Sequence, residues 1–119
     1  MSISMRDRLQ AGLLAAMKAK DPTAVKALRS TLAAIANAEA VAATLRPAGA
    51  DHPIAGSVRG LGAGDVSRRA LSELDVVDIV DTGIAERVEH ARQYDALDQT
   101  TAADQLRAEA AVLQSYLAS

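Results

Sequence analysis

Residues 21–43 read DPTAVKALRSTLAAIANAEAVAA and hold the most regular apolar spacing in the chain. Asp21 can cap a helix, and Pro22 suits the first helical position because its missing N–H would have no partner there. Apolar residues then recur at three- and four-residue steps, namely Val25, Leu28, Leu32, Ile35 and Ala42. This period is typical of one helix face packed on a core, so the stretch predicts a long amphipathic helix that organises the fold.

One charged residue, Glu39, lies on this apolar row. A carboxylate that faces a core costs free energy unless a basic group meets it, so Glu39 needs a partner elsewhere in the chain. Arg87 follows Ile84 by one turn and flanks the apolar face of a later helix. Because its planar guanidinium can hold a carboxylate through two parallel hydrogen bonds, we predict a structural ion pair between Glu39 and Arg87.

Three further stretches combine helical spacing with helix-start signals. Ser4, Ser72 and Thr101 are each followed three residues later by an aspartate, which is the pattern of a capping box. No stretch alternates apolar and polar residues as a half-buried strand would. We predict four helices, at about residues 4–20, 22–44, 72–97 and 101–117. They indicate one all-α domain over residues 1–119, a four-helix bundle-like fold of two antiparallel helix pairs.

The two predicted pairs are separated by residues 45–71, where the composition changes to Gly, Pro, Ser, His and charged residues. Pro47 and Gly49 predict the end of the second helix, and neither a helical nor a strand period follows them. The glycines of this stretch lack the G-x-G-x-x-G spacing of a phosphate-binding loop. We therefore predict a long loop over residues 45–71 that the fold can do without.

Gly83 lies inside the third predicted helix, where glycine costs about 1 kcal/mol against alanine. Such a residue indicates either a bend or a close crossing of two helices. The chain is rich in alanine and its only aromatic residues are two tyrosines, which predicts tight packing of helix on helix. We favour the crossing.

The chain has 119 residues, no cysteine and a formal net charge of −2. This length suits a single core. The lack of cysteine excludes disulfides, a thiol nucleophile and cysteine-based zinc sites. Charged residues interrupt the N-terminal region and no apolar run is long enough for a membrane span, so we expect a soluble, cytoplasmic protein with no membrane partner.

The two ends of the chain have opposite charge. Residues 1–46 contain seven Lys/Arg and three Asp/Glu, whereas residues 72–119 contain three Lys/Arg and ten Asp/Glu. This asymmetry either draws the two halves together within the fold or offers a basic face to an anionic partner. Four cations near the corner between the first two helices either remain solvated or meet phosphate. We predict that any nucleic acid contacts these four residues, the basic corner: Lys18, Lys20, Lys26 and Arg29.

The residues show no catalytic or cofactor-binding pattern. His90 has Glu86 one turn before it, but two ligands on a solvated helix do not make a metal site. The chain contains no nucleophile elbow, metalloprotease motif or P-loop. The spacing therefore predicts neither an enzyme nor a bound metal or cofactor.

Several motifs nonetheless resemble one known family. Residues 16–21 read AMKAKD, residues 28–39 contain LR, LAAI and NAE, and residues 71–73 read LSE, with the similarity continuing to Tyr116-Leu117. This pattern resembles the YqeY-like family, which is related to the tail of the B subunit of the glutamine-dependent tRNA amidotransferase (GatB). The similarity covers both ends of the chain and leaves out the loop. We expect only the N-terminal helical part, without the family's C-terminal subdomain, and Asp98 stands where the family usually has glycine.

The resemblance implies a link to carbon–nitrogen ligase chemistry with glutamine as the amido donor, in which the related tail helps to hold tRNA. None of the shared motifs is catalytic. We therefore expect a non-catalytic YqeY-like helical module whose partner is tRNA or an amidotransferase-type protein. The alternative is a small structural or adaptor protein that binds another protein through its alanine-rich helices and has no RNA role.

Overall fold

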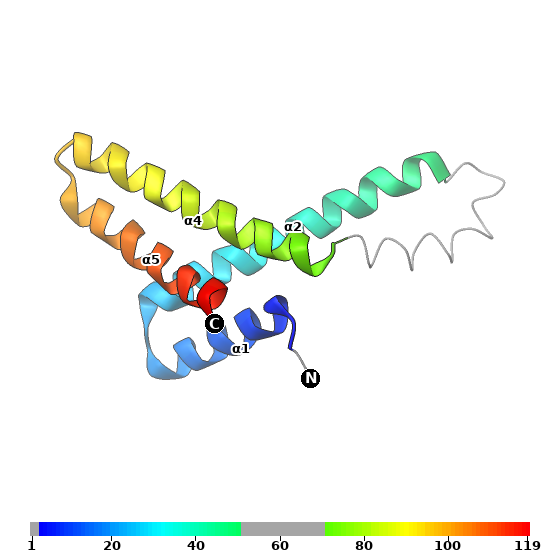
Figure 1. The fold of residues 1–119 in the computed structure, drawn as a ribbon, viewed down its shortest axis with the longest axis horizontal. Coiled ribbons are helices and arrows are strands. Elements are labelled where there is room, and N and C mark those ends of the chain that lie inside the picture. Colours follow the sequence, from blue (N-terminus) through cyan, green and yellow to red (C-terminus); the bar gives the residue numbers. More distant parts are fainter. Residues whose placement is uncertain (1–2, 51–70) are drawn as a thin grey trace.

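The computed structural model describes residues 3–50 and 71–119, with only the backbone described over residues 44–50. These residues form four helices and no strand: α1 (Met5–Ala19), α2 (Pro22–Ala50), α4 (Glu73–Ala96) and α5 (Thr100–Ala118). Figure 1 shows α4 and α5 side by side as one pair, and α1 and α2 as the other. The prediction of an all-α, bundle-like fold built from two helix pairs is confirmed.

The α2 helix packs against α1, its partner in the first pair, and against both helices of the second pair. Leu28 and Ile35 are each 1% exposed, and Val25 and Leu32 pack against the core, so these four members of the predicted apolar row are confirmed. The fifth member, Ala42, is only partly buried and lies outside the core cluster. The buried face is wider than predicted, since it also includes three smaller residues, Ala24, Ala27 and Thr31. Such small side chains let neighbouring helices approach α2 closely.

Local sequence signals define most helix starts. Ser4 and Asp21 each accept a hydrogen bond from a backbone N–H in the first turn of their helix, at 3.1 and 3.2 Å. Ser72 and Asp75 exchange both hydrogen bonds of a capping box at the start of α4. The cap predicted at Thr101 is wrong, because α5 begins one residue earlier and its start has no side-chain cap bond.

Tight turns join the helices within each pair, and each turn contains a non-glycine residue with positive φ. Lys20 (φ 57°) ends α1, and its N–H bonds to the carbonyl oxygens of Ala16 and Met17. Asp98 (φ 60°) lies between α4 and α5. A short polar side chain tolerates this left-handed conformation, and glycine adopts it freely, so glycine and aspartate can serve the same turn.

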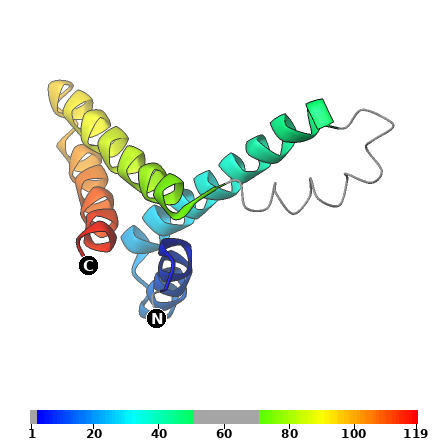
Figure 2. The same cartoon turned by 45° about the vertical axis from the view of Figure 1, so that its right-hand side comes forward.

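The α2 helix is longer than the sequence predicts. It continues through Pro47 to Ala50 and projects away from the other helices, so the predicted end near residue 44 is wrong (Figure 1, Figure 2). Proline removes one backbone hydrogen bond from a helix, but nearby alanines have the highest helix propensity. Residues 51–70 of the predicted loop lie outside the described residues, and so does the prediction that the fold can do without them.

The α1 helix is fixed against both helices of the second pair. The backbone N–H of Met5 donates to Glu73 Oε2 at 2.8 Å. Arg8 donates to the carbonyl oxygen of Tyr116 at 2.8 Å, and its guanidinium lies 5.6 Å from the centre of the Tyr116 ring. A Cβ atom added at Gly12 would overlap Tyr116 Oη, so the ring packs directly on this glycine and would have to shift for a larger residue.

Candidate functional site

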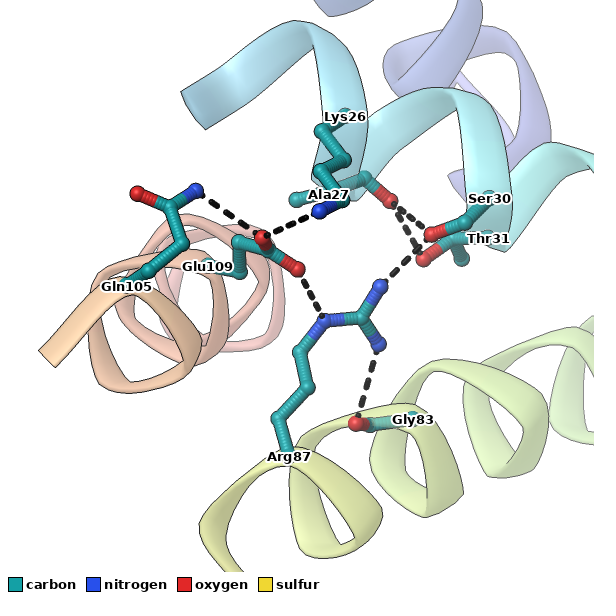
Figure 3. Close-up of polar contacts among 8 residues, drawn as sticks. All are labelled: Lys26, Ala27, Ser30, Thr31, Gly83, Arg87, Gln105 and Glu109. Carbon is teal, nitrogen blue, oxygen red and sulfur yellow. Dashed lines mark hydrogen bonds and ion pairs between the residues drawn. The ribbon is translucent and has the colours of Figure 1, made fainter. Parts of the chain in front are cut away.

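Polar side chains gather where α2, α4 and α5 meet (Figure 3), and we call this cluster the polar junction. Its centre is the carboxylate of Glu109, a residue that is 2% exposed. Arg87 Nε donates to Glu109 Oε1 at 3.1 Å, and Gln105 Nε2 donates to Glu109 Oε2 at 2.9 Å. The polar junction consists of the side chains of Lys26, Ser30, Thr31, Arg87, Gln105 and Glu109 and the carbonyl groups of Ala27 and Gly83.

The guanidinium of Arg87 connects all three helices. In addition to its bond with Glu109 of α5, its Nη1 donates to the carbonyl oxygen of Gly83 at 3.1 Å and its Nη2 donates to Ser30 Oγ at 2.6 Å. A Cβ added at Gly83 would lie 3.2 Å from Arg87 Nη1 and 3.8 Å from Leu113 Cδ1 of α5. The missing side chain at Gly83 leaves room for the Arg87 guanidinium of the same helix, whereas the distance to α5 is that of an ordinary van der Waals contact. The close crossing that the sequence predicts at Gly83 stays a prediction.

The predicted ion pair between Glu39 and Arg87 is wrong. Glu39 pairs with Arg6 of α1, and Arg87 pairs with Glu109. The reason is the place at which α4 crosses α2. Arg87 reaches α2 at Ser30, and Glu39 is nine residues further along, which is about 13.5 Å at 1.5 Å per residue. A carboxylate on the adjacent helix α5 is closer.

The sequence also indicates that Glu109 faces other helices, although the predicted ion pair does not include it. Glu109 follows Leu106 by three residues and precedes Leu113 by four, so it lies on the apolar row of α5. This is the same pattern that singles out Glu39 on α2. The periodicity identifies both carboxylates as facing other helices, but it does not say which of them meets Arg87.

All four residues of the basic corner are exposed. Lys26 extends toward the polar junction, where its Nζ lies 3.8 Å from Glu109 Oε2 while 70% of its side chain remains exposed. Within residues 3–43 and 71–119, the other three cations, Lys18, Lys20 and Arg29, form no ion pair. In the same part of the chain, Lys26–Glu109 is the one ion pair that joins the basic half to the acidic half.

Two open grooves flank the ion pair of the polar junction. The α2–α4 groove has a volume of about 460 Å³ and is lined by residues that include Ser30, Ala34, Asp78, Ile79, Glu86 and Arg87. The second groove, of about 540 Å³, is lined by residues that include Lys26, His90, Tyr94, Leu97, Gln105 and Glu109. Arg87 lines the first groove and Glu109 lines the second, so each groove reaches one member of this ion pair.

Away from the polar junction, an exposed ion pair joins α4 to α5. Arg107 Nη1 donates to Asp95 Oδ2 at 2.8 Å. This hydrogen bond holds the pKa of Asp95 below its ordinary value of 3.8 and raises the pKa of Arg107. The pair lies in solvent and is screened by salt, so it adds little to stability.

Neither a metal centre nor a membrane span is found in the part of the chain that the structure describes. No three His, Asp or Glu side chains there are grouped so that they could hold a metal ion. None of the four described helices combines the length and the apolar character that crossing a bilayer requires. No family model, curated protein or solved structure matches the chain. The resemblance to the YqeY-like family therefore rests on the motifs quoted above.

Proposed function

We propose that this chain is a non-catalytic YqeY-like helical module of the cytoplasm that binds tRNA in the context of glutamine-dependent amidation. One observation carries the proposal. Lys18, Lys20 and Arg29 are exposed and have no ion-pair partner among the described residues, so their charges are available to an anionic ligand. Lysine and arginine side chains placed in this way neutralise phosphates and release counterions from nucleic acid.

The fold supports such a role because it holds the basic corner in place. The left-handed turn at Lys20 and the cap at Asp21 fix the end of α1 relative to the start of α2. A rigid presentation of charge lowers the entropy lost on binding. Asp78, Asp81 and Glu86 form an exposed acidic surface on α4 that repels phosphate, so electrostatics favours an orientation in which RNA meets the basic corner.

The test is a titration with tRNA at about 50 mM and about 200 mM salt. If the four cations each neutralise one phosphate, the logarithm of the binding constant falls with the logarithm of salt concentration with a slope of about −3. The double substitution Lys18→Glu/Lys20→Glu should abolish tRNA retention. The matched control is Arg92→Glu/Arg107→Glu, which makes the same change in net charge on the α4–α5 pair and should retain binding. Circular dichroism confirms that each variant is folded.

A second candidate function is supported by exposed apolar side chains. Leu14 and Met17 of α1 are 62% and 47% exposed, and Leu97, beside the second groove, is 65% exposed. Such residues suit an adaptor that binds another protein. If the wild-type chain fails to bind tRNA at low salt, the tRNA proposal falls and the adaptor function takes its place.

A further inference from the structure

The opposite charges of the two halves of the chain are largely unpaired inside the fold. Three carboxylates of α4, Asp78, Asp81 and Glu86, are exposed and make no ion pair with any described residue. At the end of α1, Lys18 and Lys20 are likewise exposed and make no ion pair with any described residue. Separate faces of opposite sign on one molecule attract complementary surfaces on another.

Two of these three carboxylates lie beside the α2–α4 groove. Asp78 and Glu86 both line it and stand eight residues apart, about 12 Å along the helix axis. Between them the groove is lined by small or apolar residues, including Ala34 and Ile79, which allow another helix to approach. Arg87 also lines the groove, but its charge is already balanced by Glu109. The groove therefore suits a helix that carries apolar side chains and cations together.

The outer face of α1 has these properties. Leu14 and Met17 are exposed, Lys18 lies one turn after Leu14, and Lys20 follows at the helix end. We call this surface the α1 knob and define it by four residues: Leu14, Met17, Lys18 and Lys20.

We propose that the α1 knob of one copy of this chain binds in the α2–α4 groove of a second copy, so that the protein self-associates head to tail. Leu14 and Met17 contact the groove near Ile79, and the lysines pair with Asp78 and Glu86. A second copy is the occupant that the observations favour, because the chain itself carries the surface that complements the groove in charge and in apolar character.

Two consequences follow from this geometry. The two surfaces are different, so the contact is heterologous and each dimer retains one free knob and one free groove; association continues into a ring or an open chain. The contact area is that of one short helix in a groove, so association is weak, and its attraction between exposed charges falls as salt rises. The inference does not depend on RNA binding, and its test contains no nucleic acid.

The experiment is sedimentation equilibrium of the full chain over a wide range of protein concentrations, at about 20 mM and about 500 mM salt. At low salt the average mass should rise with concentration above the 12.4 kDa of one chain, and at high salt it should return toward that value. A mass that stays at 12.4 kDa under every condition would overturn the proposal.

Paired variants show which surfaces meet. Lys18→Glu/Lys20→Glu changes the knob and Asp78→Lys/Glu86→Lys changes the groove, and each variant alone should be monomeric. An equimolar mixture should regain self-association, because every surface then finds one of opposite charge. The matched control, Glu89→Lys/Asp104→Lys, makes the same charge change as the groove variant at exposed sites outside the groove, and should self-associate like the wild type.

Two further results would overturn the proposal. Self-association that survives either pair of substitutions would place the contact on another face, as in a symmetric dimer. Variants that remain monomeric when mixed would show that knob and groove do not meet. Where a charge reversal unfolds the chain, Lys18→Gln/Lys20→Gln and Asp78→Asn/Glu86→Gln serve instead, and each should weaken association without abolishing the fold.

Discussion

Two glutamates occupy equivalent positions on the apolar rows of their helices, yet their surroundings differ. The Glu109 side chain is 3% exposed and lies within reach of Arg87, Gln105 and Lys26. The Glu39 side chain is 36% exposed and is held by Arg6. A position on an apolar row sets the direction in which a side chain points, whereas the number of helices that cover it decides how far it is buried.

This difference determines how much each ion pair matters to stability. A carboxylate buried among three helices has lost its water, so loss of a partner leaves an uncompensated charge. A half-exposed carboxylate regains water when its partner is removed. The polar junction should therefore respond strongly to substitution, and the Arg6–Glu39 contact should respond weakly.

The largest effect is expected for Arg87→Met. This substitution leaves Glu109 with Gln105 and a distant Lys26, and it removes the bond to Ser30 of α2, so we expect the free energy of unfolding to fall by about 3 kcal/mol. Urea unfolding followed by circular dichroism measures it. The matched control is Arg92→Met, whose pair with Glu89 is exposed on both sides and should contribute below about 1 kcal/mol. If both variants lost the same free energy of unfolding, the buried ion pair would not matter more to stability than the exposed one.

An intermediate loss of stability is expected for Gly12→Ala. This substitution tests the packing of α1, the helix that carries Arg6, the partner of Glu39. The new Cβ would clash with the Tyr116 ring. Overpacking costs about 1 to 3 kcal/mol, and the higher helix propensity of alanine offsets about 1 kcal/mol of that, so a net loss of about 1 kcal/mol is expected. In a Tyr116→Leu background the same substitution should be neutral or stabilising. A full loss in that background would show that the ring is not the obstacle.

A smaller effect is expected for Glu39→Gln. The side chain keeps its shape and its access to water, so the free energy of unfolding should change by less than about 1 kcal/mol. High salt should reduce that difference further, because the contact is partly exposed. A fall of about 3 kcal/mol in the free energy of unfolding would mean that Glu39 contributes as much to stability as Glu109.

The smallest effect concerns the exposed Asp95–Arg107 pair. Because Arg107 lowers the pKa of Asp95 in the folded chain, the pair adds a little stability above the ordinary value of 3.8, and this contribution is lost as pH falls through the lower, folded pKa. Arg107→Met should return the pKa of Asp95 to near 3.8. An NMR titration of the carboxyl group measures the shift, and an unchanged pKa would show that the pair does not persist in solution.

Features set by local sequence could be predicted. The row of Leu28 and Ile35 and the caps at Ser4, Asp21 and Ser72 depend on spacing within a few residues. Features set by contacts between distant segments could not be predicted from the sequence. The partner of Arg87 depends on where α4 crosses α2, and the sequence does not contain that crossing point in any local pattern. The start of α5 likewise depends on the turn that precedes it.

The most direct test of the polar junction is a pair of double-mutant cycles that share Arg87→Met. Combined with Glu109→Gln, the two single losses should be strongly non-additive, with a coupling above about 1 kcal/mol, because the residues contact each other. Combined with Glu39→Gln, the losses should add to within about 0.5 kcal/mol. Additivity with Glu109, or coupling with Glu39, would contradict this account of which carboxylate Arg87 holds.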